Sequence, residues 1–193
     1  MPDLVVVIIY LTFVLDFIVF PIPSEASTLA MSKHRNHQKS QKPYLVWATH
    51  LLVLITWFFP LLVALYHLLA KENPVSIALF TGGILFAILG RVITISTSLT
   101  LTRSRSSRKE PALVTTGLFS LSRHPIVLGL HMTLAGLLMT TGVAWTLIPF
   151  LITVLYFDYK LDIEESQLME LYGDNYAEYK NRTHRYLNWP NFY

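Results

Sequence analysis

Long apolar runs with few charges are the feature that most restricts what this chain can fold into. Such runs occupy residues 4–20, 44–70, 75–95, 126–141 and 143–159. A helix needs about 20 consecutive apolar residues to cross a bilayer, so the runs predict membrane-spanning helices. Charged residues make up 14% of the chain, against about 25% in an average soluble domain. We therefore expect an all-α integral membrane protein with about five spans, and a single membrane domain over residues 1–193.

The first apolar run does not have the charge pattern of a secretory signal. Asp3 is the only charge before it, whereas a signal usually opens with positive charge, and the run is long for the apolar part of a signal. We expect a retained span, and cleavage after Ala26 is the weaker alternative.

Basic side chains gather in two loops. The first loop, residues 31–43, has no acid, and the second, residues 103–124, has one glutamate. The basic residues are Lys33, Arg35, Lys39 and Lys42 in the first loop, and Arg103, Arg105, Arg108, Lys109 and Arg123 in the second. Because basic loops are retained in the cytoplasm, both are expected there. Five spans then place the N-terminus outside, the C-terminus in the cytoplasm, and any site at these loops on the cytoplasmic side.

The last two runs predict a helical hairpin, because Thr140, Thr141 and Gly142 leave room for only a tight turn. The third run contains TGGILFAILG, a glycine pattern that favours close helix packing. From Lys160 onward the tail is polar, but apolar and aromatic side chains recur in it at roughly helical spacing. Gly173 is expected to divide this tail into two helices. We expect an amphipathic cytoplasmic segment that lies against the membrane domain.

The predicted topology brings several polar side chains to one membrane boundary. Arg123, His124 and Pro125 precede the fourth run, and Glu164 and Glu165 follow the fifth. Each has an ordinary structural interpretation alone, since arginine can snorkel and proline suits a first helical turn. Together they favour a ligand site, with the tail as a lid. A carboxylate beside aromatic rings suits a partly apolar cation such as S-adenosylmethionine, although these residues alone leave other ligands open.

A resemblance to a known family narrows the choice of ligand. The stretches GLFSLSRHPIVLG and EESQLMELYGDNYAEYKNRTHRYLNWP resemble the isoprenylcysteine carboxyl methyltransferase and phospholipid methyltransferase family over about residues 112–190. The matching positions are Gly117, Phe119, Arg123, His124, Pro125, Gly129, Glu164, Glu165, Leu168, Tyr172, Gly173, Tyr176, Tyr179 and Arg185. The resemblance divides the chain into three N-terminal spans, residues 1–101, and a cofactor-binding half, residues 102–193.

The resemblance implies an integral membrane methyltransferase that uses S-adenosylmethionine and a lipophilic acceptor. The implied cofactor-binding residues are Leu113, Val114, Gly117, His124, Pro125, Glu165 and Tyr176. The implied catalytic residues are Arg123, Glu164 and Glu165, and the implied acceptor-binding residues are Arg91, Lys160, Tyr179 and Arg185. We expect no metal and no nucleic-acid partner.

The chain departs from the family pattern at three positions. Val127 stands where the family usually has tyrosine, and Asn188 replaces a proline after Arg185. Lys160 stands where isoprenylcysteine enzymes often have arginine, which keeps the charge but loses the bidentate fork. The acceptor therefore stays open between an isoprenylcysteine carboxylate, a lipid amine and similar groups.

Two other classes of protein stay open. Membrane sterol reductases, which use NADPH, resemble the C-terminal half, and the arginines at 103–108 could bind its phosphates. A non-catalytic membrane scaffold is the second alternative, and Val127 is the residue that favours it. His131, in the fourth run, could face a cofactor cavity or form an interhelical hydrogen bond, and the second reading is slightly preferred.

Overall fold

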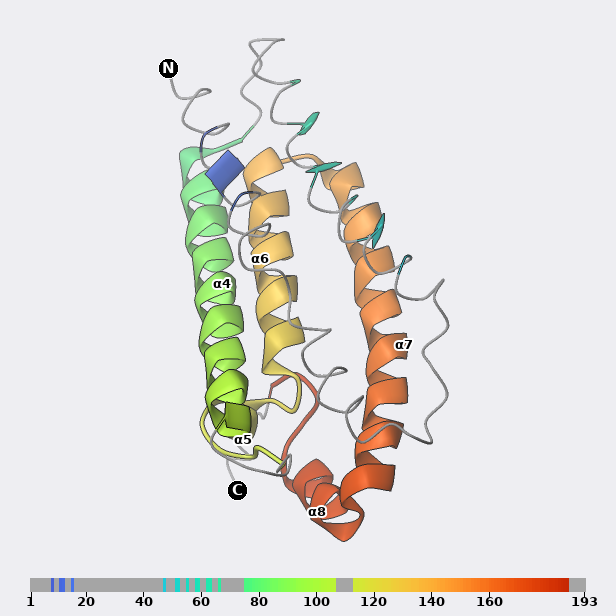
Figure 1. Ribbon diagram of the computed structural model, residues 1–193. Coiled ribbons are helices and arrows are strands. Elements are labelled where there is room, and N and C mark those ends of the chain that lie inside the picture. Colours follow the sequence, from blue (N-terminus) through green and yellow to red (C-terminus); the bar gives the residue numbers. More distant parts are fainter. Residues whose placement is uncertain are drawn as a thin grey trace, which may run out of the picture.

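The computed structural model describes residues 75–106 and 113–187, together with isolated positions between residues 8 and 66. The continuous ranges contain α4 (Ile77–Ser106), α5 (Leu118–Leu121), α6 (Pro125–Thr141), a short 3₁₀ turn η1 (Ala144–Thr146), α7 (Leu147–Tyr172) and α8 (Asp174–Arg182). Figure 1 shows α4, α6 and α7 as three long helices with α5 and α8 gathered at one end. The described part is all-helical, as predicted. The predicted spans at 4–20 and 44–70 lie outside the continuous ranges.

Helices α4 and α6 run antiparallel in close contact through facing glycines (Figure 1). A Cβ atom added to Gly83 would lie 2.6 Å from the carbonyl oxygen of Gly136, and one added to Gly90 would lie 2.5 Å from that of Gly129. Because neither position carries a side chain, the two backbones can approach closely, and a side chain there would have no space. The close packing predicted from the glycine pattern is confirmed.

The turn between α6 and α7 forms the predicted hairpin. Helix α6 ends at Thr141, and Gly142 follows with a left-handed φ of 63°. The chain then makes the 3₁₀ turn η1 before α7 begins at Leu147. The connection is therefore longer than the predicted turn at residues 140–142, because η1 takes up the first residues of the apolar run that predicts the fifth span.

Two helices continue beyond the apolar runs that predicted them. Helix α4 extends to Ser106 instead of ending near residue 95, so Arg91 lies at the middle of the helix and not near its end. Helix α7 extends to Tyr172, because the residues after 159 are mostly good helix formers. Glu164 and Glu165 therefore stand on a rigid continuation of the hairpin.

Gly173 separates α7 from α8. It has φ 52° and ψ −127°, a conformation that strongly favours glycine. Its N–H donates to the carbonyl of Met169 over 2.9 Å, which closes α7, and its own carbonyl accepts from Tyr176 N–H over 3.0 Å. The prediction that Gly173 divides the tail is confirmed.

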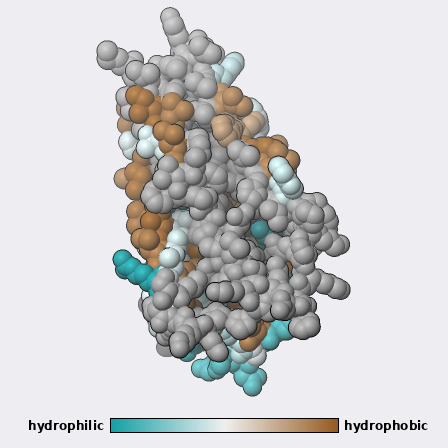
Figure 2. Space-filling view, in the orientation of Figure 1, coloured by the Kyte–Doolittle hydropathy of each residue, from teal (hydrophilic) through white to brown (hydrophobic). Residues whose placement is uncertain are grey.

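Apolar side chains cover the outer faces of α4 and α7. The exposed ones include Leu85, Ile88, Leu89 and Val92 on α4, and Ile148, Leu151 and Leu155 on α7. Figure 2 shows hydrophobic residues along the edge formed by α4 and hydrophilic ones towards the end that carries α8. One helix of the described residues, Ile77–Ser104, is long and apolar enough to cross a membrane, and α6 is a shorter apolar helix. The five-span topology and its orientation stay predictions.

Candidate functional site

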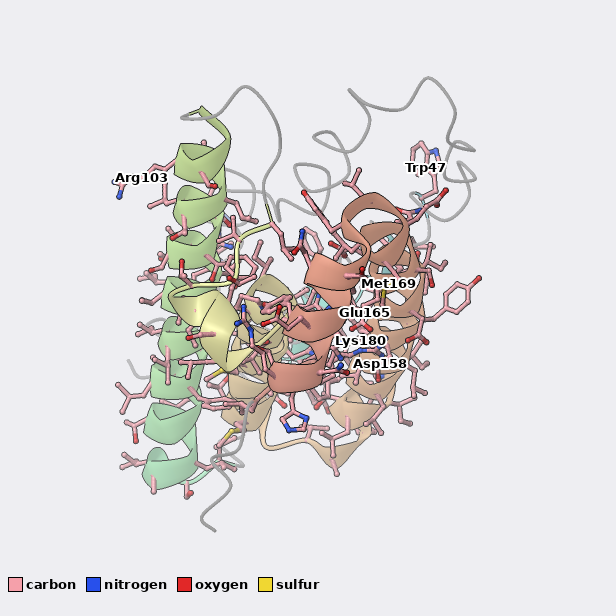
Figure 3. The ribbon with its side chains drawn as sticks, turned by 90° about the horizontal axis from the view of Figure 1, so that it is seen from below. Trp47, Arg103, Asp158, Glu165, Met169 and Lys180 are labelled. Carbon is pink, nitrogen blue, oxygen red and sulfur yellow. The ribbon has the colours of Figure 1, made fainter. Side chains whose placement is uncertain are left out.

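Glu165 is the centre of a cluster of charged residues at the end of the hairpin. Its side chain is 4% exposed on α7. Four nitrogen-bearing side chains reach its two carboxylate oxygens. These are Arg123 Nη2 at 3.2 Å, His124 Nε2 at 3.3 Å, Lys180 Nζ at 3.1 Å and Arg185 Nε at 3.1 Å. Figure 3 shows Glu165 and Lys180 close together, seen from the end of the bundle where α8 lies.

The short loop between α5 and α6 supplies two of these partners. Pro125 occupies the first turn of α6, where a missing N–H has no cost. His124, the N-cap, is 7% exposed, and its ring makes no capping hydrogen bond. The imidazole is therefore available to Glu165, and Arg123 beside it reaches the same carboxylate.

The C-terminal segment is fastened to that loop by its backbone. Arg123 N–H donates to the carbonyl of His184 over 3.0 Å, and His124 N–H donates to that of Arg185 over 3.2 Å. The hydroxyl of Ser122 also donates to the carbonyl of Arg185, over 2.9 Å. These bonds hold the Arg185 side chain over α7, so three segments far apart in the sequence meet at Glu165.

An acidic stripe on α7 receives the Arg185 guanidinium. Asp158, Asp162 and Glu165 lie on one helical face, and Arg185 Nη1 is 3.6 Å from Asp158 Oδ1. Arg185 also pairs with Asp162 through Nη2, at 2.5 Å, in addition to Glu165. The Tyr186 hydroxyl donates to Asp158 over 2.6 Å. The stripe thus fixes the position of the C-terminal segment.

The partners of Glu165 decide its protonation. Burial by itself would raise the pKa of Glu165, but hydrogen bonds from His124, Arg185 and Lys180 and the charge of Arg123 outweigh it. The pKa of Glu165 is therefore held well below its usual range. The hydrogen bond to Glu165 likewise raises the pKa of Arg185 above its usual value. This carboxylate is ionised at every ordinary pH.

An aromatic cluster lies beside the charged one. Phe119, Tyr176 and Tyr179 are buried together, and Leu113 and Val114 pack against them. The Tyr179 hydroxyl donates to the carbonyl of Phe119 over 2.7 Å, which ties α8 to α5. Burial raises the pKa of Tyr179 to about 12.

Two buried polar atoms at this junction have no hydrogen-bond partner within the described residues. They are the Tyr176 hydroxyl, on a side chain that is 1% exposed, and Arg123 Nε. An unpaired buried polar group costs about 1–3 kcal/mol, so such atoms are expected where a polar ligand binds.

The structure brings most of the predicted site residues together. Arg123, His124, Glu165 and Arg185 form the charged cluster, and Leu113, Val114, Tyr176 and Tyr179 belong to the adjoining aromatic cluster. Gly117 precedes α5 with φ 66° and is exposed.

Three predicted residues lie apart from the contacts of Glu165 that the structure describes. Arg91 is 7% exposed within α4. Glu164 and Lys160 are half-buried on α7. The NADPH alternative relies on the arginines at 103–108 to bind phosphates. Figure 3 places one of them, Arg103, on the outer side of α4, away from Glu165.

Sequence reasoning missed Lys180, Asp158 and Asp162. A signal for the two aspartates was present, since residues 158, 162 and 165 follow the i, i+4, i+7 spacing of one helical face. Lys180 had no comparable signal, because its contact depends on how α8 folds back after Gly173.

The fold and site define a helical protein with a polar site at the end of an apolar hairpin. The family described as phospholipid methyltransferase matches residues 74–175, more than half of the chain. The chain belongs to this family, which confirms the resemblance and implies a methyltransferase that acts on lipid substrates. Comparisons with curated proteins and with solved structures found no match. The family match ends just before Tyr176, so Lys180 and Arg185 are placed at the site by the structure.

Proposed function

We propose that this chain transfers a methyl group from S-adenosylmethionine to a lipophilic acceptor that enters from the bilayer. The observation that carries the proposal is the position of the Glu165 cluster, because the family match covers the helices that lead to it. The exposed apolar faces of α4 and α7 border the route by which a lipid would arrive. The positive-inside rule assigns the site to the cytoplasmic side, where the cofactor is soluble.

The residues present fit the chemical groups of S-adenosylmethionine. Arg123 has an Nε donor with no partner among the residues that the structure describes, and this donor suits a carboxylate. Asp162 and Asp158 are exposed enough, at 64% and 40%, to receive an ammonium group. The buried Tyr176 offers a hydroxyl that has no partner within the described residues. Bound there, S-adenosylmethionine would supply an electrophilic methyl group.

Glu165 acts in this proposal mainly as a positioning residue. Its carboxylate is already surrounded by four nitrogen-bearing partners, so it has little negative potential left for a sulfonium. What it does is hold Arg123 and His124 from one segment and Arg185 from another in one arrangement. Positioning of this kind accounts for much of the rate in reactions that need alignment of two reactants.

Calorimetric titration of the detergent-purified full chain tests this proposal. The ligands are S-adenosylmethionine, S-adenosylhomocysteine and NADPH, and the variants are His124→Ala and Glu165→Gln. His124→Ala removes no helix cap, because the imidazole makes no capping bond. Glu178→Gln is the matched control, since Glu178 is 77% exposed and pairs with Arg182 in the same helix.

Binding of both adenosyl ligands, weakened at least tenfold in the two site variants and unchanged in the control, would support the proposal. Binding of NADPH alone would assign the chain to the reductase alternative. Binding of none of the three ligands would favour the scaffold alternative.

A further inference from the structure

His131 is enclosed by aromatic rings between the two arms of the hairpin. It stands on α6, seven residues after His124 and thus about 10 Å further along the helix. Its ring centroid lies 6.3 Å from that of Phe150, 5.8 Å from that of Phe157 and 5.7 Å from that of Tyr186. The rings come from α7 and from the C-terminal segment, so His131 faces away from the glycine contact with α4.

The Nε2 atom of His131 is buried and has no hydrogen-bond partner within the described residues. The interhelical hydrogen bond preferred from the sequence is therefore not made by this atom there. Aromatic carbons cannot replace such a bond, and leaving a buried polar atom unpaired destabilises the fold. In its neutral form an imidazole nitrogen can accept a hydrogen bond from a ligand.

A chain of contacts joins His131 to the charged cluster. Tyr186, whose ring packs on His131, donates its hydroxyl to Asp158 over 2.6 Å. Asp158 lies 3.6 Å from Arg185, and Arg185 binds Glu165 over 3.1 Å. The titratable or charged groups linked to His131 in this way are Tyr186 on the C-terminal segment, Asp158 on α7 and, behind Asp158, Arg185. The aromatic rings around His131 thus form an apolar region next to the proposed cofactor site.

We propose that His131 binds the reacting group of the lipid acceptor and takes the proton from it. This inference rests on the proposed function. An acceptor whose reacting atom carries a hydrogen, such as an amine, must lose a proton before its lone pair can attack. A carboxylate needs no such residue and would meet aromatic faces and Asp158, which favour a positive group. His131 therefore selects acceptors with a protonated nucleophile.

The proton and the electrons balance for a lipid amine. The ammonium group gives one proton to Nε2 of His131, and the freed nitrogen lone pair forms a bond to the methyl carbon of the sulfonium donor. The carbon–sulfur bond breaks and its electron pair stays on sulfur, so the methylated ammonium carries the charge. His131 then returns its proton to water.

The test compares His131→Phe, which keeps a ring and removes Nε2, with the wild-type chain in lipid nanodiscs. His131→Gln keeps a polar acceptor atom and is the second variant, should the first not fold. Tyr159→Phe is the control, because Tyr159 is on α7 and 56% exposed. Methyl transfer to phosphatidylethanolamine and to a prenylcysteine carboxylate is measured by mass spectrometry from pH 6 to 9. Binding of a short-chain phosphoethanolamine lipid is titrated without the cofactor.

We expect His131→Phe to lower kcat for the amine about 100-fold, with S-adenosylmethionine affinity unchanged, in the range usual for loss of a positioned base. In this variant the rate should rise more steeply with pH than in wild type, because only amine that has already lost its proton in water can then react. Cofactor-free binding of the amine lipid should weaken at least tenfold. Equal rates and equal binding in His131→Phe and wild type would overturn the proposal, as would a wild-type chain that methylates only the carboxylate. If the wild type binds no S-adenosylmethionine, the proposed function fails, and the cofactor-free lipid titration alone decides the role of His131.

Discussion

Arg185 donates a hydrogen bond from Nε to Oε1 of Glu165 over 3.1 Å, across 20 residues of sequence. This contact joins the C-terminal segment to α7 at the carboxylate that Arg123 and His124 reach from the α5–α6 loop. One buried side chain thereby holds three segments together. Its loss is expected to affect the arrangement of the whole site.

Glu165→Gln should destabilise the folded chain by about 3 kcal/mol, because the substitution leaves Arg123, Arg185 and Lys180 with no carboxylate at the centre of the cluster. Unfolding in detergent, followed by circular dichroism, measures the change. The control Glu178→Gln breaks an exposed pair within α8 and should cost about 0.5 kcal/mol or less. Equal effects of the two substitutions would contradict the central role of Glu165.

The pH dependence of stability follows from the same carboxylate. The pKa of Glu165 in the folded chain lies below the usual value of 4.5, so its contribution to stability is complete above that pH. It is lost as the pH falls further towards the folded-state pKa. We expect the difference in unfolding temperature between wild type and Glu165→Gln to be constant from pH 7 to about pH 5, and to shrink below pH 4.5. A difference that grows on acidification would show the opposite sign and refute this account.

Gly90→Ala should destabilise the α4–α6 contact by about 1–3 kcal/mol, because its Cβ would lie 2.5 Å from the backbone of Gly129 and Thr133. Gly82→Ala is a matched control on the same helix, where a Cβ meets nothing within 4 Å. This substitution should leave stability unchanged or raise it by up to about 1 kcal/mol, because alanine has a higher helix propensity than glycine. Thermal unfolding of both variants provides the comparison, and similar losses at the two positions would rule out the close contact.

Tyr179→Phe should cost about 1–2 kcal/mol, because it removes the 2.7 Å hydrogen bond that ties α8 to the carbonyl of Phe119. Hydrogen exchange should then increase in α8 and α5 and stay unchanged in α4. Tyr159→Phe removes the same kind of hydroxyl from an exposed side chain, and it should leave both stability and hydrogen exchange unchanged. Unaltered exchange in α8 would show that this bond does not hold the helix.

The helices α6 and α7 could be predicted because their signals are local. Apolar runs marked both helices, and Gly173 marked the end of α7 through a backbone conformation that side chains disfavour. The run at 75–95 gave α4 too short a length, since its polar continuation carries no apolar signal although its residues form a helix. Helix length is set by local propensity and capping as well as by hydropathy.

The members of the site were only partly predictable. Arg123, His124 and Glu165 stood out as polar residues at the ends of apolar runs, and the structure joins them. Lys180 and Asp158 did not stand out. Their contacts depend on the path of the chain after Gly173 and on the return of the C-terminal segment to the α5–α6 loop.

The sequence by itself determined the helical class, the hairpin, the packing glycines and the family, because each depends on residue types at short spacing. Only the tertiary structure decided that Glu165 is shared by four partners and that His131 is enclosed by rings from α7 and the C-terminal segment. The physical reason is that these contacts join residues up to 55 positions apart. Helical periodicity reports which residues share a face of one helix, but the folding of the whole chain decides which faces meet.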